Sequence, residues 1–193
     1  MDSNTFTTIS HIIQSRRTIK PAIMNGQKIP NGHIAAILEL ADWAPTHGLT
    51  EPWRFVIYEH PTAFCKQHAE LYKQHTPAEN FKDGTYNNLL TIGNTVSHII
   101  IAYMKRGSNP NIPALEEIAA TSAAVQNMLL AATALNIGSF WSSGGMTLKP
   151  AMKDFLELGT EDQVIGLIYL GYSDQHPEGK RVTPIEEKLK WVK

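Results

Sequence analysis

Cysteine is almost absent from this sequence, because its 193 residues include only one, Cys65. A single cysteine excludes an internal disulfide framework, a cysteine-rich zinc site and a CxxC redox pair. Cys65 follows Phe64 in a segment expected to be helical, where a buried, unreactive thiol is the expected state. Any redox chemistry of this chain must therefore come from a bound group.

An excess of either charge is also absent, since 17 lysines and arginines and 18 aspartates and glutamates leave a formal charge of −1. This balance gives no overall field that would attract nucleic acid or an acidic membrane. The longest apolar run, 96–104, contains Ser97 and His98 and is about half of a membrane span. Near the N-terminus the arginines follow the apolar residues, the reverse of a secretory signal. We expect a cytoplasmic protein that binds neither nucleic acid nor membrane.

The familiar hydrolase and nucleotide motifs are missing as well. The sequence has no GxxxxGK[ST] loop, no GxGxxG after a strand, no HExxH and no GxSxG. His68 and His75 stand seven residues apart in a polar segment, so we expect solvated surface histidines and no metal site. Without a nucleophile or a metal cluster, hydrolysis has little support.

What is present is enough apolar sequence, 42% of the residues, to fill the core of one domain spanning residues 1–193. Apolar periodicity and helix-ending residues predict an α+β fold, with helices around a central mixed sheet and an extended polar C-terminal tail. We expect helices in an opening segment that runs to Ser15, from an Asn31 cap to near Ala44, within 60–90 and over 114–137, strands at 53–58, 96–104 and 164–170, and a tail over 172–193.

The most basic cluster is Arg16-Arg17-Thr18, with Lys20 two residues further on. Neighbouring arginines on a helix point about 100° apart, so one can reach a phosphate while the other pairs elsewhere. Three cations and a hydroxyl suit a small phosphorylated ligand. A basic surface turn is the alternative.

Two loops and the tail offer further candidates. His47 lies in a loop between Pro45 and Gly48, at a helix-to-strand junction where binding groups often sit. The segment 141–145, Trp-Ser-Ser-Gly-Gly, lets a flat ring approach the main chain. Arg181 belongs to a basic spot in the tail that could meet Arg16 around one dianion. The alternatives are a surface histidine, a tight turn after a buried tryptophan and a solvated charge run.

Taken in order, these segments resemble the FMN-dependent nitroreductase family, in its compact, YdjA-like branch. The resemblance covers nearly the whole chain. The segments that carry it are Ser15-Arg16-Arg17-Thr18, Ala44-Pro45-Thr46-His47, Pro52-Trp53-Arg54-Phe55, Leu135-Asn136-Ile137-Gly138, Trp141-Ser142-Ser143-Gly144 and the run 165–172.

The resemblance implies an intertwined homodimer with two FMN sites at the subunit interface. It assigns Arg16, Arg17 and Thr18 to the flavin phosphate, ribityl chain and pyrimidine edge. Because a nearby cation favours an anion, we expect Arg17 or Lys20 to stabilise the negative charge of the reduced ring. The other implied cofactor-binding residues are Trp43 and His47 from the second subunit, Trp141, Ser142 and Ser143 beside the ring, and Arg181 at the phosphate. Trp43 replaces an arginine of the branch pattern.

The function that follows is an NAD(P)H-dependent nitroreductase with no catalytic side-chain acid or base. NADPH or NADH would give hydride to the flavin N5, and a nitroaromatic, quinone or related small-molecule acceptor would then replace it in a ping-pong cycle. Two alternatives remain: the same fold acting on an enone or semialdehyde, or a flavin-binding regulatory module without turnover.

Overall fold

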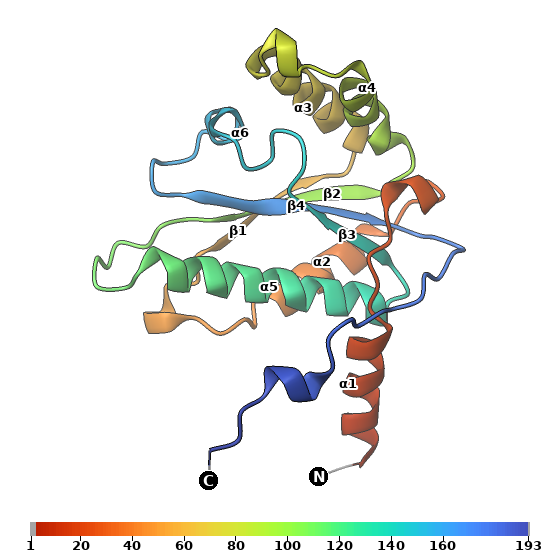
Figure 1. Cartoon of the computed structure of the whole chain (residues 1–193), viewed down its shortest axis with the longest axis vertical. Helices are drawn as coiled ribbons and strands as arrows, with labels where there is room; N and C mark the ends of the chain where they lie inside the picture. The colour runs from red at the N-terminus through yellow and green to blue at the C-terminus, as the bar shows by residue number, and fades with distance from the viewer. Residues whose placement is uncertain (1–2, 193) are drawn as a thin grey trace.

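The computed structural model describes residues 3–192 and has an α+β fold around a four-stranded sheet (Figure 1). The strands follow the order β1-β2-β4-β3 and pair antiparallel throughout. The mixed sheet expected from the sequence is therefore wrong for these strands, since within residues 3–192 the parallel pairing recorded is a bridge between Thr18 and Ser139. Apolar runs predict burial of both faces but do not fix strand direction. The strands are β1 (Trp53–Tyr58), β2 (His98–Met104), β3 (Gly138–Ser142) and β4 (Gln163–Gly171).

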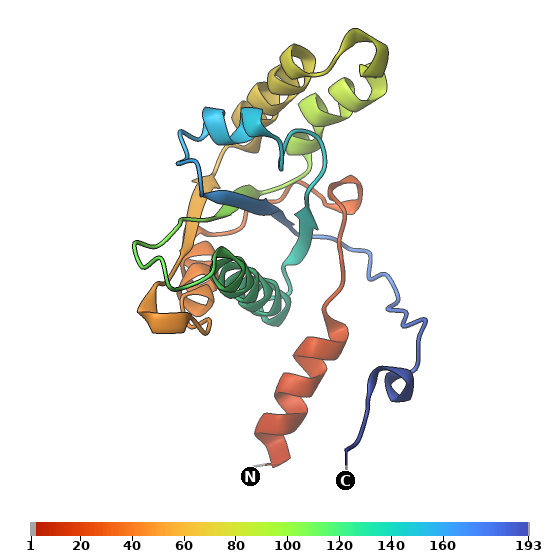
Figure 2. The same cartoon turned by 60° about the vertical axis from the view of Figure 1, so that its left-hand side comes forward.

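Six α-helices of the described chain surround this sheet. Helices α2 and α5 cover one face, whereas α6 and the base of the α3–α4 pair lie on the other (Figure 1). In a second view, α3 and α4 project from one end of the molecule, and α1 and the tail from the opposite end (Figure 2). The helices are α1 (Ser3–Ser15), α2 (Asn31–Ala41), α3 (Pro61–His75), α4 (Asp83–Thr91), α5 (Ala114–Ala134) and α6 (Pro150–Phe155).

Strand β2 divides the core because successive side chains of a strand point to opposite faces. Ile100 and Ala102 join the cluster beneath α2 and α5. Ile99 and Ile101 join the cluster under α3 and α6, which also contains Cys65. Cys65 is 1% exposed, so the expectation of a buried cysteine is confirmed. Burial raises the pKa of its thiol to about 11, which favours the unreactive, protonated form.

The end of α5 follows the sequence closely. Asn136 adopts a left-handed backbone with φ of 56°, and the Ile137 N–H donates to the Ala132 carbonyl at 2.8 Å. This is the hydrogen bond that ends a helix in a Schellman motif. Helix α2 instead stops at Ala41, three residues before the expected end, and Asn31 is its first residue and not its cap.

One prediction about buried groups is wrong: His68 is not a surface histidine. Its side chain is 2% exposed, while His75 on the same helix is exposed. The described residues contain no cluster of three His, Cys, Asp or Glu side chains able to hold a metal. In that same part of the chain, no helix is both long enough and apolar enough to cross a membrane.

Candidate functional site

The segment after α1 meets strand β3 and forms one wall of a small groove. The Ile19 N–H donates to the Ser139 carbonyl at 2.9 Å, next to the parallel bridge between Thr18 and Ser139. The groove encloses about 290 Å³. It is lined by Arg16, Thr18, Gln126, Leu129, Ser139 and Trp141.

Arg16 is half-buried in this groove and has no partner of its own. Among residues 3–192 it is the one arginine whose guanidinium takes part in no hydrogen bond or ion pair with the protein. Burying a charge without a partner is unfavourable, so the position favours an anionic ligand. The Thr18 hydroxyl and the Gln126 amide add donors on the same groove.

Arg17 lies differently from Arg16, but not for the expected reason, because α1 ends at Ser15 and the two arginines are not successive residues of a helix. Its Nη1 donates to the Gln14 carbonyl at 2.6 Å and to the Arg16 carbonyl at 2.9 Å. It lines a second, larger groove of about 670 Å³, bounded by α1, the end of α5 and the start of the tail. Lys20 is exposed and lies outside the lining of both grooves.

Trp141 packs its indole against Gly166 of the neighbouring strand, at the edge of the groove. Its Nε1–H donates to the Ile165 carbonyl at 3.1 Å, and 36% of the residue stays exposed. Gly166 makes this possible, because a Cβ there would overlap the indole Nε1. The indole therefore presents an open aromatic surface beside Arg16 and Thr18.

Ser142 and Ser143 stand at the point where β3 turns away from the sheet. The Gly144 N–H donates to the Ser142 Oγ at 3.3 Å, while Ser143 is exposed. Neither serine lines the groove itself. The expected turn therefore begins two residues later than the motif suggests, because Trp141 and Ser142 still belong to β3.

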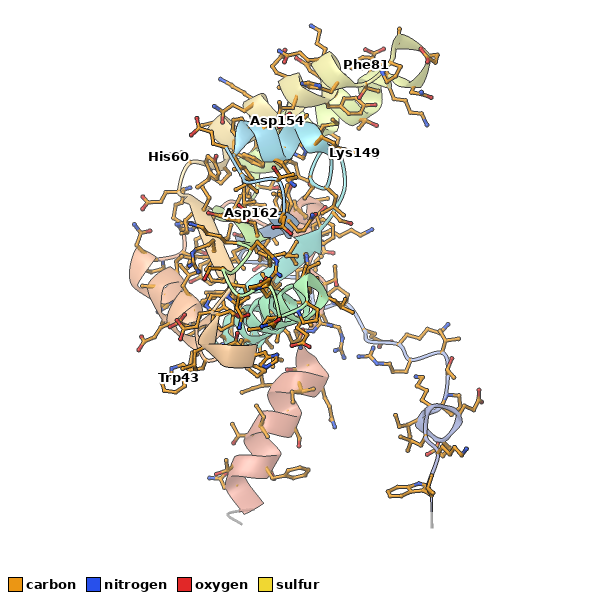
Figure 3. The ribbon with its side chains drawn as sticks, turned by 90° about the vertical axis from the view of Figure 1, so that its left-hand side faces the viewer. Trp43, His60, Phe81, Lys149, Asp154 and Asp162 are labelled. Atoms are coloured by element: carbon orange, nitrogen blue, oxygen red, sulfur yellow. The ribbon has the colours of Figure 1, made fainter. Side chains whose placement is uncertain are left out.

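His47 and Trp43 are not brought to this groove within one chain. The His47 Nδ1 pairs with the Glu116 Oε2 at 2.5 Å, on the first turn of α5. Leu129 of the groove is thirteen residues further along that helix, which corresponds to about 20 Å. Trp43 is 81% exposed and points outward at the lower left of the folded body, with α1 and the tail reaching further down (Figure 3).

The loop that carries His47 has an unusual backbone. Leu49 and Glu51 both adopt positive φ values, 56° and 41°, and Gly48 adopts 58°. A left-handed conformation costs a residue with a side chain about 1–2 kcal/mol. Such conformations cluster at functional loops, which makes this exposed loop a candidate for binding.

The tail keeps Arg181 apart from Arg16. Arg181 is exposed and its Nη1 donates to the carbonyl of its neighbour Lys180 at 3.1 Å. Gly179 passes so close to Arg17 that a Cβ there would overlap the guanidinium. The tail thus begins against the basic cluster and then runs beyond the body of the fold (Figure 2).

This geometry can be compared with that of known proteins. The model of the protein family described as "Nitroreductase family" matches residues 13–172 of this chain. These residues are most of the chain and include the whole sheet and the groove. The chain belongs to the nitroreductase family. The resemblance drawn from the sequence motifs is therefore confirmed.

Individual nitroreductase relatives match over nearly the full length. "Putative NAD(P)H nitroreductase YfhC" from Bacillus subtilis is 29% identical over 188 residues, covering 92% of this chain and 91% of its own. A nitroreductase-like family protein from Bacillus cereus has a TM-score of 0.83 at 27% identity, with 95% of both chains covered. A nitroreductase with bound FMN from Bacteroides fragilis has a TM-score of 0.68 at 19% identity, covering 96% of this chain and 98% of its own.

Three lining residues of this nitroreductase groove were not found from the sequence: Gln126, Leu129 and Ser139. Leu129 lies on the predicted apolar stripe of the long helix, where nothing separates a groove position from a core position. Ser139 could not be recognised as a lining residue because the sequence does not predict the short strand β3 that carries it. A polar Gln126 near that stripe was the one available signal.

Proposed function

We propose that this chain is an FMN-dependent oxidoreductase that uses NADPH or NADH to reduce nitroaromatic, quinone or related small-molecule acceptors in a ping-pong cycle. The observation that carries the proposal is the unpaired, half-buried Arg16 beside Thr18 and Trp141. A cation, a hydroxyl and an open aromatic face suit a ligand with both a phosphate and a flat ring. The family, the named relative and the FMN-bound neighbour support this choice of ligand.

FMN, when bound, supplies the hydride-transfer chemistry. The protein's own residues bind and orient it: Arg16 holds the phosphate, and Arg17 and Thr18 contact the ribityl chain and pyrimidine edge. Arg181 joins Arg16 at the phosphate, which requires the tail to fold from its position in this structure toward the groove. Arg17 or Lys20 adds positive charge near that edge, since a guanidinium has five N–H donors and Arg17 engages only Nη1. Trp141, Ser142 and Ser143 flank the ring.

We further propose that the working form is a homodimer, in which a second copy brings His47 and Trp43 to the groove. At about 290 Å³ the groove of one chain falls just below the roughly 300–1,000 Å³ of complete small-molecule sites. Large apolar side chains are exposed on α1 and on the tail, with Phe6 71% and Trp191 85% exposed. Exposed apolar groups of this kind suit contact with a partner.

The direct test is a titration of the purified protein with FMN, followed by NADPH or NADH without oxygen. We expect bound flavin absorbance that either nucleotide bleaches and that a nitroaromatic or quinone restores. Bound FMN that neither nucleotide bleaches would indicate a regulatory flavin-binding module. If only an enone or semialdehyde restored the flavin absorbance, the reaction would be the reduction of that class of acceptor. Protein that does not bind FMN would overturn the proposal.

A further inference from the structure

A buried histidine outside the groove contacts the turn that follows Trp141. The Nε2 of His68, on α3, accepts a hydrogen bond from the Met146 backbone N–H at 2.9 Å. The His68 side chain is 2% exposed, and Met146 is 6% exposed. This is a polar contact across 78 residues of sequence, beside the apolar cluster that contains Met146.

The turn, residues 143–147, is fitted closely to the imidazole. Gly145 adopts a φ of 62°, and a Cβ there would lie 2.8 Å from the His68 Nε2. The Thr147 hydroxyl donates to the Gly144 carbonyl at 2.6 Å and closes the turn on itself. The position of this turn therefore depends on His68 on one side and on its own hydrogen bond on the other.

We propose that His68 is a positioning residue for the flavin site: by accepting the Met146 N–H it fixes the 143–147 turn, which contains Ser143 and directly follows Trp141 and Ser142. This inference rests on the proposed FMN function. Burial lowers the pKa of His68 to about 4, which keeps the imidazole neutral and its Nε2 free to accept at physiological pH. An acceptor on α3 thus controls how the end of β3 meets the ligand.

Substitution of this acceptor separates positioning from mere packing. His68→Leu leaves the Met146 N–H buried without a partner, whereas His68→Gln keeps an acceptor oxygen at about the same distance along the side chain. Cys65→Ala is the matched control, because Cys65 is equally buried on the same helix but does not contact the turn. Gly145→Ala keeps the histidine but displaces the turn from it, because the added Cβ would lie 2.8 Å from the His68 Nε2. This variant serves if the leucine variant does not fold.

The measurements are the FMN Kd, the visible spectrum of bound FMN and hydrogen exchange across residues 143–149. We expect His68→Leu and Gly145→Ala to raise the Kd about threefold to tenfold, to shift the spectrum and to speed exchange. His68→Gln should restore all three, and Cys65→Ala should change none.

Wild-type binding in His68→Leu, or an equal loss in Cys65→Ala, would overturn the role of His68 alone. A wild-type protein that fails to bind FMN would overturn the proposed function and this inference with it.

Discussion

Two partly buried arginines lie beside opposite halves of α5, and they differ in whether the protein supplies a partner for the guanidinium. Near its start, Arg106 donates from Nη1 to the Glu117 Oε2 at 2.5 Å and from Nη2 to the Ile112 carbonyl at 2.7 Å. The second oxygen of Glu117 accepts the Gly107 N–H at 3.0 Å. Beside the later turns of the same helix, Arg16 has no such partner among the described residues.

This difference separates residues that hold the fold from residues that can hold a ligand. Both arginines are partly buried, so burial alone does not distinguish them. Glu117 is 1% exposed, and its oxygens are used entirely within the protein. A guanidinium that the fold leaves unpaired in a groove retains its full capacity for an external anion.

The largest effect should come from breaking the internal pair. Glu117→Gln removes the charge that compensates Arg106, and we expect the free energy of unfolding to fall by about 3–5 kcal/mol. Urea denaturation of the flavin-free protein measures this loss. Glu161→Gln is the control, since Glu161 is 74% exposed and 3.9 Å from Arg106, and it should cost less than about 1 kcal/mol. Equal losses in the two variants would mean that burial of Glu117 does not strengthen the pair.

A second internal group, His68, should make stability depend on pH. Its pKa is lowered to about 4 in the folded protein and is near 6.5 when unfolded, so below about pH 6.5 the unfolded state binds the extra proton. Stability is therefore complete above pH 6.5 and is lost as the pH falls toward 4, by about 3 kcal/mol in all. His68→Gln should flatten this part of the urea-derived profile. The lowered pKa of His98 acts in both proteins, so their difference isolates His68.

Much of the fold could be predicted because its signals are local. The apolar and aromatic run 53–58 is strand β1 with the expected bounds, and Asn136 ends α5 as its residue type suggests. Strand β3 was missed because Gly138–Ser142 looks like a turn by composition. It becomes a strand through pairing with β4, where Trp141 faces Ile168, and no local pattern encodes that pairing.

In the candidate site too, residues in local motifs could be predicted, whereas residues placed by contacts between distant segments could not. Arg16, Thr18 and Trp141 were found from motifs, and the structure brings these three together. The sequence predicts a surface position for His68 because its polar helix resembles a surface helix. Its burial comes from the turn around Met146, which is distant in sequence and folds over the imidazole.

Removing the unpaired Arg16 should weaken FMN binding and leave stability unchanged, whereas breaking the internal pair of Arg106 and Glu117 should lower stability. Arg16→Ala should raise the FMN Kd about 10- to 100-fold, since a hydrogen bond to a charged group contributes roughly 1.5–3 kcal/mol. Its unfolding free energy without FMN should stay within about 0.5 kcal/mol of wild type, because no internal contact is lost. Fluorescence titration and urea denaturation measure the two quantities. A large loss of stability with unchanged Kd would assign Arg16 to the fold.

The smallest single effect is expected at His47, which lies at the α5 end opposite to Arg16. His47→Ala should raise the FMN Kd by about threefold to tenfold, as expected for one hydrogen-bonding contact. Mixed dimers of Arg16→Ala and His47→Ala subunits then test whether the contact crosses between chains. If it does, one site of each mixed dimer has both residues intact and binds FMN with wild-type affinity, while the other has lost both. If each chain binds alone, every site lacks one residue and none recovers. Two different affinity tags, one on each kind of subunit, allow the mixed dimers to be purified. Titration with FMN then shows whether each mixed dimer has one site of wild-type affinity or no such site.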